Sequence, residues 1–194
     1  MKKIFMYLLM ISMCILLPAY LALADNFKPP KEGSELPLVQ LPTPETSEER
    51  NYLGIEEKDF FTIPKIKANL IIIYFFSFYC RFCAEQAVHV NELYRAIDNN
   101  PDLKKKIKLI GIGIGNTPTE VDAYKETHRI PFPLLPDPDF AIHKAYGEIK
   151  APNFLVAGIK DDGTQRVVCR TFAFYDANDF LKLILKKSML TRSD

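Results

Sequence analysis

Two cysteines set two residues apart, Cys80 and Cys83 in "FFSFYCRFCAEQ" (75–86), are the side chains best suited to chemistry. Such a pair can be a redox-active dithiol, a structural disulfide or half of a metal site. A zinc site needs about four ligands, and beyond the first 24 residues only Cys169 and three scattered histidines remain. A disulfide closing so short a loop removes little chain entropy. The pattern therefore favours a redox dithiol.

The elements around the pair make Cys80 the expected nucleophile. The run "LIIIYFF" (70–76) shows no polar alternation, which indicates a strand buried on both faces. Apolar residues then recur every three or four positions from Phe82 to Ile97, which predicts an amphipathic helix. Cys80 would lie at the helix start, where unpaired N–H groups and the positive dipole end stabilise a thiolate. Cys83, one turn later, could attack a mixed disulfide formed on Cys80.

Residues beside the pair are expected to tune the thiolate and to contact a partner. Arg81 supplies a cation, and Tyr79 and Phe82 supply aromatic surface suited to an extended protein segment. Glu85 could carry the proton of Cys83, although one residue along a helix turns about 100°. An exposed helix glutamate is the alternative interpretation of Glu85.

The rest of the chain predicts an α/β layered sandwich with a mixed sheet and helices on both faces. The expected elements after the first helix are a strand at 106–114, a helix starting at the Thr117 cap, a proline-rich connection at 131–140, a short helix near Phe140–Tyr146, a β-hairpin of strands 153–159 and 165–171, and a helix capped by Asp176. Upstream, we expect a short strand at 38–41 and an edge hairpin at 51–63 lying on the main sheet. The lysine run 104–108 is interpreted as a solvated rim.

The N-terminus has the pattern of a secretory signal peptide over residues 1–24. Lys2 and Lys3 precede an uncharged stretch that closes on Ala22-Leu23-Ala24, an A-x-A cleavage pattern. The alternative is an uncleaved membrane anchor, since about 20 apolar residues can span a bilayer. We therefore expect a protein of the periplasm or cell envelope, with an extended lead-in at 25–50 and one domain at 51–190.

Charge and cysteine count exclude several function classes. Without the leader, 23 basic side chains face 24 acidic ones, and this near-neutral balance argues against a nucleic-acid partner. Three of the four cysteines remain once the leader is removed, an odd number for a disulfide-stapled fold, and Cys169 is interpreted as a small buried hydrophobe. The "GIGIGN" run (111–116) lacks the G-x-G-x-x-G spacing of a dinucleotide loop.

The cysteine motif after a buried strand, together with "APNFLV" (151–156), resembles the thioredoxin superfamily. The resemblance spans roughly residues 35–187. It implies a thioredoxin-like three-layer sandwich with a cis bond between Ala151 and Pro152, facing the cysteines. It also implies that Ala151, Pro152 and Asn153 position the substrate. The leader and "FPLLPDPDFAIHKAYG" (132–147) resemble the exported redoxin branch, TlpA- and ResA-like, which borders the AhpC/TSA peroxiredoxins.

The chain departs from the superfamily's pattern at several positions near the cysteines. Tyr79 replaces the usual Trp before the first cysteine, and the dipeptide between the cysteines is Arg-Phe. The buried acid that thioredoxin carries six residues before its first cysteine is Tyr74 here. The glutamate that ResA-like proteins carry three residues after the second cysteine is Gln86, with Glu85 adjacent.

The expected function is an exported thiol–disulfide oxidoreductase that acts on protein thiols and disulfides and is served by an upstream redox partner. No cofactor or metal is expected, because the dithiol itself carries two electrons. One alternative is a peroxiredoxin-like peroxidase; Ser77 matches that motif, whereas Tyr74 replaces its proline. Another is a copper-handling module that would use the two cysteines as ligands. Copper-delivery members of this fold favour a CxxxC spacing and a nearby histidine, and neither is evident here.

Overall fold

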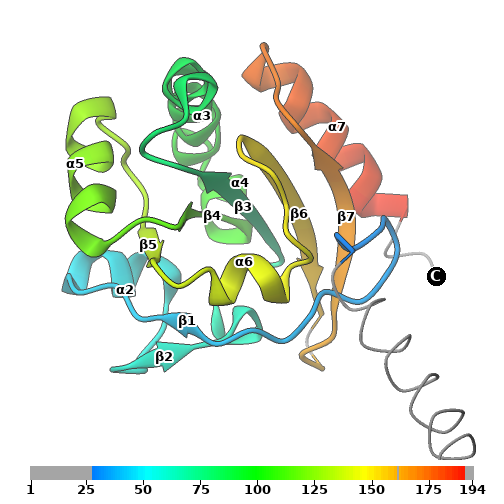
Figure 1. Cartoon of the computed structure of the whole chain (residues 1–194). Helices are drawn as coiled ribbons and strands as arrows, with labels where there is room; N and C mark the ends of the chain where they lie inside the picture. Colours follow the sequence, from blue (N-terminus) through cyan, green and yellow to red (C-terminus); the bar gives the residue numbers. More distant parts are fainter. Residues whose placement is uncertain (1–27, 161, 191–194) are drawn as a thin grey trace, which may run out of the picture.

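The computed structural model describes residues 28–160 and 162–190, so the expected leader at 1–24 lies outside the described part. A five-stranded mixed sheet with the order β5-β4-β3-β6-β7 forms the middle of the molecule (Figure 1). Its strands are β3 (Leu70–Phe76), β4 (Ile107–Ile114), β5 (Leu134–Asp137), β6 (Asn153–Ile159) and β7 (Gln165–Thr171). β3, β4 and β5 are parallel, whereas β6 and β7 form an antiparallel hairpin beside β3. No helix in the described ranges could cross a bilayer.

Helices and short strands cover both faces of this sheet and complete three layers (Figure 1). One face is covered by α3 (Arg81–Asp98), α5 (Pro118–His128) and α7 (Ala177–Leu190); we call it the α3 face. The opposite face is covered by α2 (Ser47–Leu53), α6 (Ala141–Ala145) and a separate two-stranded sheet of β1 (Leu41–Pro42) and β2 (Phe60–Phe61); we call it the α6 face. The short helices α4 (Pro101–Lys106) and η2 (Ile63–Lys65) connect these elements. The predicted thioredoxin-like α/β fold is confirmed.

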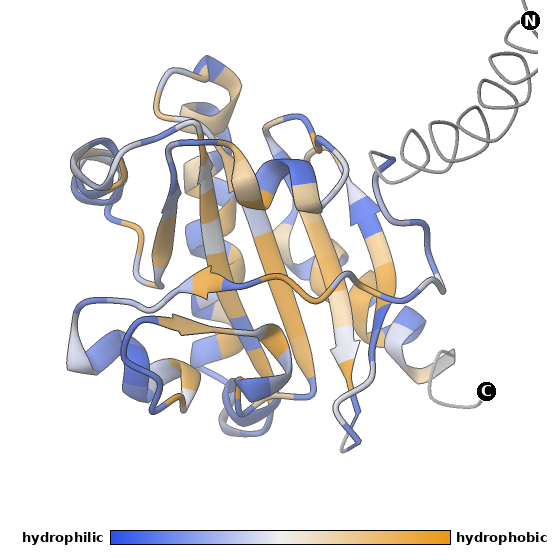
Figure 2. Cartoon of the chain, turned by 60° about the horizontal axis from the view of Figure 1, so that its bottom comes forward, coloured by the Kyte–Doolittle hydropathy of each residue, from blue (hydrophilic) through white to orange (hydrophobic). Residues whose placement is uncertain are grey.

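Strand β3 lies at the centre of the core, as its uninterrupted apolar run predicts. All seven of its residues are buried, with β4 on one side and β6 on the other. Alternate side chains point to opposite faces of a strand, so Ile72 and Tyr74 join the α3 face whereas Ile73 and Phe75 join the α6 face. Figure 2 shows the central strands as largely hydrophobic. The end of β3 is therefore a rigid support for the residues that follow it.

The predicted helix starts are confirmed by their caps. The α5 start has the full capping box: Thr117 accepts from the Glu120 N–H, and the Glu120 carboxylate accepts from the Thr117 N–H. Asp176 accepts from the Asp179 N–H at the start of α7. The hairpin of β6 and β7 also matches the predicted strands, at 153–159 and 165–171.

The expected edge hairpin at 51–63 is wrong. Residues up to Leu53 belong to α2, and β2 pairs with β1 rather than with the main sheet. Helix α2 is capped by Thr46, which accepts from the Glu49 N–H, and it ends at Gly54 with a φ of 69°. This is an S/T-x-x-E start followed by a left-handed glycine stop, a signal that was present in the sequence.

The expected connection at 131–140 also contains a strand that the prolines concealed. Strand β5 pairs with β4 in parallel, with Pro136 opposite Gly113. β5 is an edge strand, and an edge strand tolerates a proline because one side of it makes no ladder hydrogen bonds. The lysine run 104–108 is likewise divided between the end of α4 and the start of β4.

Candidate active site

Cys80 occupies the N-cap of α3, immediately beyond the sheet. Its Sγ accepts a hydrogen bond from the Cys83 N–H at 3.2 Å, and its carbonyl accepts from the N–H groups of Cys83 and Ala84. An N-cap sulfur thus takes the place of the oxygen that usually satisfies a free N–H at a helix start. The side chain is half-buried, so the sulfur can be reached from solvent. The predicted placement of Cys80 at the helix start is confirmed.

Cys83 lies one turn into α3, completely buried beneath Cys80. Both cysteines are free thiols. Burial, followed by the hydrogen bond to Cys80, raises the pKa of the Cys83 thiol well above its usual range. The Ser77 backbone and the Tyr74 hydroxyl partly offset this shift. The two thiols are therefore unequal: one is accessible, and the other is shielded and held neutral.

The loop between β3 and α3 is held by a buried asparagine of the next loop in the sheet. The Phe78 N–H donates to Asn116 Oδ1 at 2.8 Å, and Asn116 is completely buried. Its Nδ2 lacks a hydrogen-bond partner within the described residues. Asn116 holds the backbone of the loop that leads to Cys80. Sequence reasoning missed this role because it considered the "GIGIGN" run only as a possible dinucleotide loop.

Aromatic side chains form an exposed rim around Cys80. Tyr79 and Phe82 are 74% and 63% exposed, and Phe78 packs edge-on against Tyr79. The Tyr79 hydroxyl donates to the Glu120 carboxylate, which raises the pKa of Tyr79 and lowers that of Glu120. Large exposed aromatic groups beside a reactive thiol form a surface on which another polypeptide can lie.

Arg81 and Glu85 lie on the outer side of α3 and pair with each other. Arg81 Nε donates to Glu85 Oε1 at 3.1 Å, with the two side chains 87% and 58% exposed. The pair is neutral overall and open to solvent, which screens its field. The structure therefore places Glu85 as an exposed helix glutamate, one of its two sequence interpretations.

Gln86, at the position where ResA-like proteins carry glutamate, is buried and hydrogen-bonded to the backbone of Phe174. Its Nε2 donates to the Phe174 carbonyl at 2.8 Å, and its Oε1 accepts from the Phe174 N–H at 3.3 Å. These two hydrogen bonds join α3 to the segment between β7 and α7. Both polar ends of the Gln86 amide are occupied, so it is engaged in structure.

The proline loop and the cysteine loop meet at one hollow of about 520 Å³. The Ala151–Pro152 peptide bond is cis, as the family resemblance implies. Ser77 and Tyr79 line the hollow from the cysteine side, and Lys150 and Ala151 line it from the proline side. Pro152 and Asn153 are buried, and Asn153 Oδ1 has no hydrogen-bond partner within the described residues. The structure thus brings the sequence-predicted positioning loop next to the Cys80 rim.

The remaining cysteine and the histidines lie outside this site. Cys169 is buried in β7, and desolvation raises its pKa to about 11, as expected of a small core residue. His89 contacts Glu92 on the surface of α3, and His128 packs on the Tyr124 ring. In the part of the chain that is described, no three His, Cys, Asp or Glu side chains form a group able to hold a metal ion.

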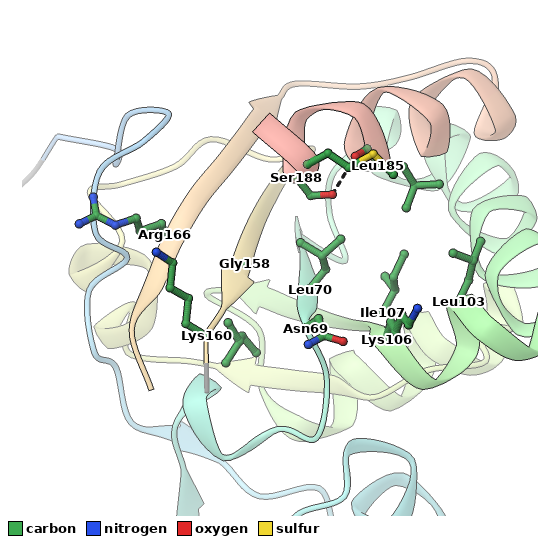
Figure 3. Close-up of a pocket in the computed structure, with 12 residues that line it drawn as sticks. Asn69, Leu70, Leu103, Lys106, Ile107, Gly158, Lys160, Arg166, Leu185 and Ser188 are labelled. Carbon is green, nitrogen blue, oxygen red and sulfur yellow. Dashed lines mark hydrogen bonds between the residues drawn. The ribbon is translucent and has the colours of Figure 1, made fainter. Parts of the chain in front are cut away.

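A second cavity, of about 270 Å³, lies at the opposite end of the sheet (Figure 3). It is lined by Leu70 and Ile107 at the starts of β3 and β4, and by Leu185 of α7. The cysteines follow the far end of β3, six strand steps or about 20 Å away. This cavity therefore does not contribute to the dithiol site.

Comparisons with known proteins identify a family and several structures of similar fold. The AhpC/TSA family model matches residues 39–184. A comparison with curated protein sequences gives no match.

Several solved structures have a similar fold at low sequence identity. A candidate thiol:disulfide interchange protein DsbE from Chlorobium tepidum has a TM-score of 0.60 at 14% identity, over 82% of this chain and 99% of that one. A secreted Mycobacterium tuberculosis disulfide oxidoreductase, homologous to E. coli DsbE, gives 0.53 at 15% identity, over 76% and 95%. StoA from Bacillus subtilis gives 0.54 at 16%, over 77% and 98%. These likenesses establish the thioredoxin-like fold.

Proposed function

The chain belongs to the AhpC/TSA family, and from that premise we propose that it is an exported thiol–disulfide oxidoreductase that exchanges its Cys80–Cys83 pair with protein partners. The observation that carries the proposal is the pairing of an accessible N-cap thiol with a buried thiol one turn later. The first is suited to attack from solvent, and the second to act after a partner is attached.

The exchange runs in two steps with the electrons balanced. The Cys80 thiolate attacks a partner disulfide, one partner sulfur leaves and takes up a proton, and a mixed disulfide remains on Cys80. The Cys83 sulfur then loses its proton and attacks Cys80 Sγ, which releases the second partner sulfur and leaves a Cys80–Cys83 disulfide. An upstream dithiol restores the reduced pair by the reverse sequence. The same steps run backwards when the protein acts as an oxidant.

The surroundings of Cys80 support a polypeptide as the substrate. Tyr79 and Phe82 offer exposed aromatic area, and the hollow beside Ala151 is lined by Tyr79. An extended segment lying there could pair with the backbone of Ala151, the partly exposed residue that precedes the buried Pro152 and Asn153. Backbone pairing provides affinity with little dependence on partner sequence, as in other cases of strand addition.

Export rests on the leader pattern of residues 1–24, with residues 25–50 as the lead-in and 51–190 as the domain. A secreted M. tuberculosis protein among the structural neighbours agrees with that placement. Cleavage would release the domain, whereas an uncleaved leader would tether it to the membrane. Mass spectrometry of protein isolated from the expressing cells distinguishes these states, because cleavage removes residues 1–24.

Turnover in an insulin-reduction assay tests the proposal. Cys80→Ser should abolish turnover, Cys83→Ser should accumulate a mixed disulfide visible by mass, and Cys169→Ala should retain activity as the matched cysteine control. Retained turnover in Cys80→Ser would reject the assignment.

The family match favours one second function, the reduction of hydroperoxides. In that reaction Cys80 would be oxidised to a sulfenic acid with release of an alcohol, and Cys83 would then form the disulfide with release of water. Consumption of hydrogen peroxide by the fully reduced protein, compared with that by Cys80→Ser, tests this function separately from insulin reduction.

A further inference from the structure

Two buried tyrosine hydroxyls converge on the first turn of α3. The hydroxyls of Tyr74 and Tyr124 lie 3.1 Å and 2.8 Å from the Cys83 carbonyl oxygen, and 3.1 Å from each other. Tyr74 comes from β3 and Tyr124 from α5, and both are essentially inaccessible to solvent. Three elements thus meet at Cys83, the residue that must resolve the mixed disulfide.

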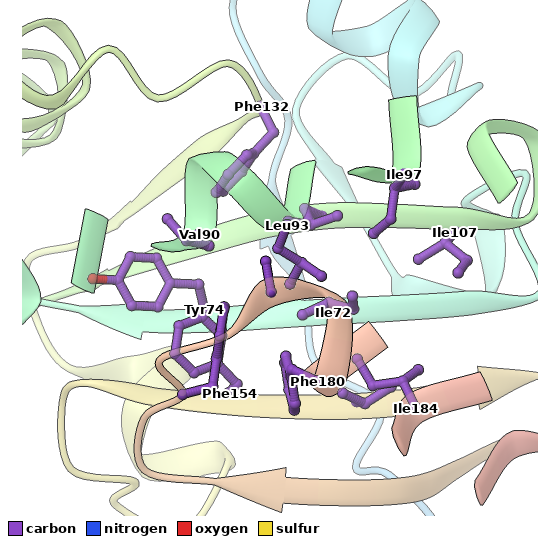
Figure 4. Packing of buried hydrophobic residues seen from close by; sticks show 14 of the residues in the cluster. Ile72, Tyr74, Val90, Leu93, Ile97, Ile107, Phe132, Phe154, Phe180 and Ile184 are labelled. Atoms are coloured by element: carbon purple, nitrogen blue, oxygen red, sulfur yellow. The ribbon is translucent and has the colours of Figure 1, made fainter. Parts of the chain in front are cut away.

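The aromatic packing holds both hydroxyls in place. The Tyr74 ring stacks on Phe154 with centroids 4.8 Å apart, and the Tyr124 ring stacks on Phe76 at 4.4 Å. Figure 4 shows the Tyr74 ring lying against Phe154 with its hydroxyl oxygen pointing away from that ring. Such rings have little freedom to move, so the hydroxyls are fixed relative to Cys83.

The two hydroxyls have fewer hydrogens than contacts, and the Tyr74 hydrogen is not needed at the Cys83 carbonyl once Tyr124 donates there. Two O–H groups cannot fill three contacts at once, and Tyr124 makes the shorter bond to the Cys83 carbonyl. The Tyr74 hydrogen can then turn toward the Cys83 sulfur, and the Tyr74 hydroxyl already lowers the pKa of that thiol. Tyr74 therefore lies beside Cys83, with its hydroxyl 3.1 Å from the carbonyl oxygen of that residue.

No carboxylate among the described residues serves this position. Glu85 is paired with Arg81 on the surface, and Glu120 is bonded to Tyr79. The groups that face Cys83 and its two tyrosines are Cys80 on its own helix, the Ser77 backbone, and His128 against the Tyr124 ring. A thiolate formed at Cys83 must therefore be stabilised by neutral donors.

We infer that Tyr74 is a catalytic residue of the resolution step, donating its O–H to the Cys83 sulfur as that sulfur becomes a thiolate. Tyr124 is a positioning residue that holds the Cys83 carbonyl. The inference rests on the proposed function, because it concerns the same dithiol. Tyr74 keeps its own proton throughout. Cys83 releases its proton to solvent, and the departing partner thiolate takes up one proton, so the protons balance. The Cys80–Cys83 bond forms as the Cys80–partner bond breaks.

A two-phase reaction with the aryl disulfide 5,5′-dithiobis(2-nitrobenzoate) separates the two steps. The first coloured thiolate is released when Cys80 attacks, and the second is released when Cys83 resolves. In Tyr74→Phe, the second phase should slow about tenfold at neutral pH and its pH midpoint should rise by about one unit, while the first phase is unchanged. In Tyr124→Phe the second phase should slow without a shift in midpoint.

Tyr146→Phe is the matched control, since Tyr146 is also fully buried but lies on the α6 face. It should leave both phases unchanged. Replacing Tyr74 with the more acidic 3,5-difluorotyrosine should move the second-phase midpoint down, opposite to Tyr74→Phe.

A second phase in Tyr74→Phe with the wild-type midpoint, or midpoints that move in the same direction in both Tyr74 variants, would overturn the inference. Failure of the proposed function looks different: Cys80 of the wild-type protein would then give no first phase, or no second phase at any pH.

Discussion

The two faces of the sheet are built from one strand but differ in the partners of their buried tyrosine hydroxyls. On the α3 face, the hydroxyls of Tyr74 and Tyr124 are hydrogen-bonded to each other and to the Cys83 carbonyl. The buried Gln86 amide on the same face is bonded to the Phe174 backbone. The α6 face is also largely hydrophobic, and the Asp137 carboxylate is buried there at the start of α6. The hydrogen-bonded hydroxyls thus lie on the face that carries the dithiol, which is where a buried thiolate would need donors.

Two buried tyrosines show the contrast most clearly. Tyr74 has two hydrogen-bond contacts at its hydroxyl, whereas the Tyr146 hydroxyl has none within the described residues. Tyr146 packs edge-on against Phe75 and fills volume. A phenol in a core can therefore be part of a site or only part of the packing, and its partners decide which.

The largest expected effect is on stability and should be similar on both faces. Phe154→Ala on the α3 face and Phe75→Ala on the α6 face should each lower the free energy of unfolding by about 3–5 kcal/mol, because each empties a fully buried site. Urea unfolding measures this. Only Phe154→Ala should also change the rate at which Cys83 resolves, because Phe154 packs on Tyr74. Equal effects on that rate would remove the distinction between the faces.

Alkaline pH should weaken both faces together. Burial raises the pKa values of Cys83, Tyr74, Tyr124 and Tyr146, and that of Cys169 to about 11. Below about pH 8.5 these groups are neutral in both folded and unfolded chains, so their contribution is fully present. Above that pH the unfolded chain loses protons first, and each of the two buried cysteines alone lowers the free energy of unfolding by about 2–3 kcal/mol by about pH 10.5.

Unfolding free energies measured at about pH 8 and about pH 10.5 test this expectation. Tyr146→Phe should reduce the loss, since it removes one buried phenol. A stability that stays constant across this range would show that these groups ionise in the folded state.

Intermediate effects are expected where one polar side chain joins two elements on each face. Gln86→Ala should cost about 2 kcal/mol, because the Phe174 N–H and carbonyl lose their buried partner. Asp137→Ala should cost a similar amount, because its carboxylate accepts the N–H groups of Ile142 and His143 at the start of α6. Thermal unfolding of both variants checks this. Only Gln86→Ala should alter dithiol reactivity, and a change in both would contradict the comparison.

The smallest effect is expected on the outer side of α3. Glu85→Gln should change stability by no more than about 0.5 kcal/mol, since the pair with Arg81 is exposed. Insulin reduction should stay within about twofold of wild type, as expected where surface charges are screened. A tenfold loss would instead make Glu85 a proton carrier for Cys83.

Local signals in the sequence predicted much of the fold. The apolar run at 70–76, the Thr117 capping box and the Asp176 cap each depend on neighbouring residues, and all three are confirmed. Strand β5 was missed because its proline is acceptable only at an edge, and edge position follows from the tertiary pairing. Helix α2 was missed although its Thr46 cap and Gly54 stop were present.

The two cysteines of the site could be predicted from the sequence, but the buried tyrosines that contact Cys83 could not. Cys80 and Cys83 are close in sequence, and their placement follows from the strand and helix around them. The Tyr74–Tyr124 contact joins residues 50 positions apart, and a single sequence carries no signal for such a pair. In the sequence, Tyr74 stands out only because it replaces the buried acid that thioredoxin carries at this position.

Alkylation of the reduced protein with iodoacetamide, followed by mass spectrometry of each cysteine peptide, measures whether the two thiols have different roles. At neutral pH, modification should occur at Cys80, with Cys83 and Cys169 unmodified in the folded protein. Denaturation should then expose all three to the reagent. Modification of Cys83 before Cys80, or equal modification of both in the folded state, would contradict an accessible nucleophile paired with a shielded resolving thiol.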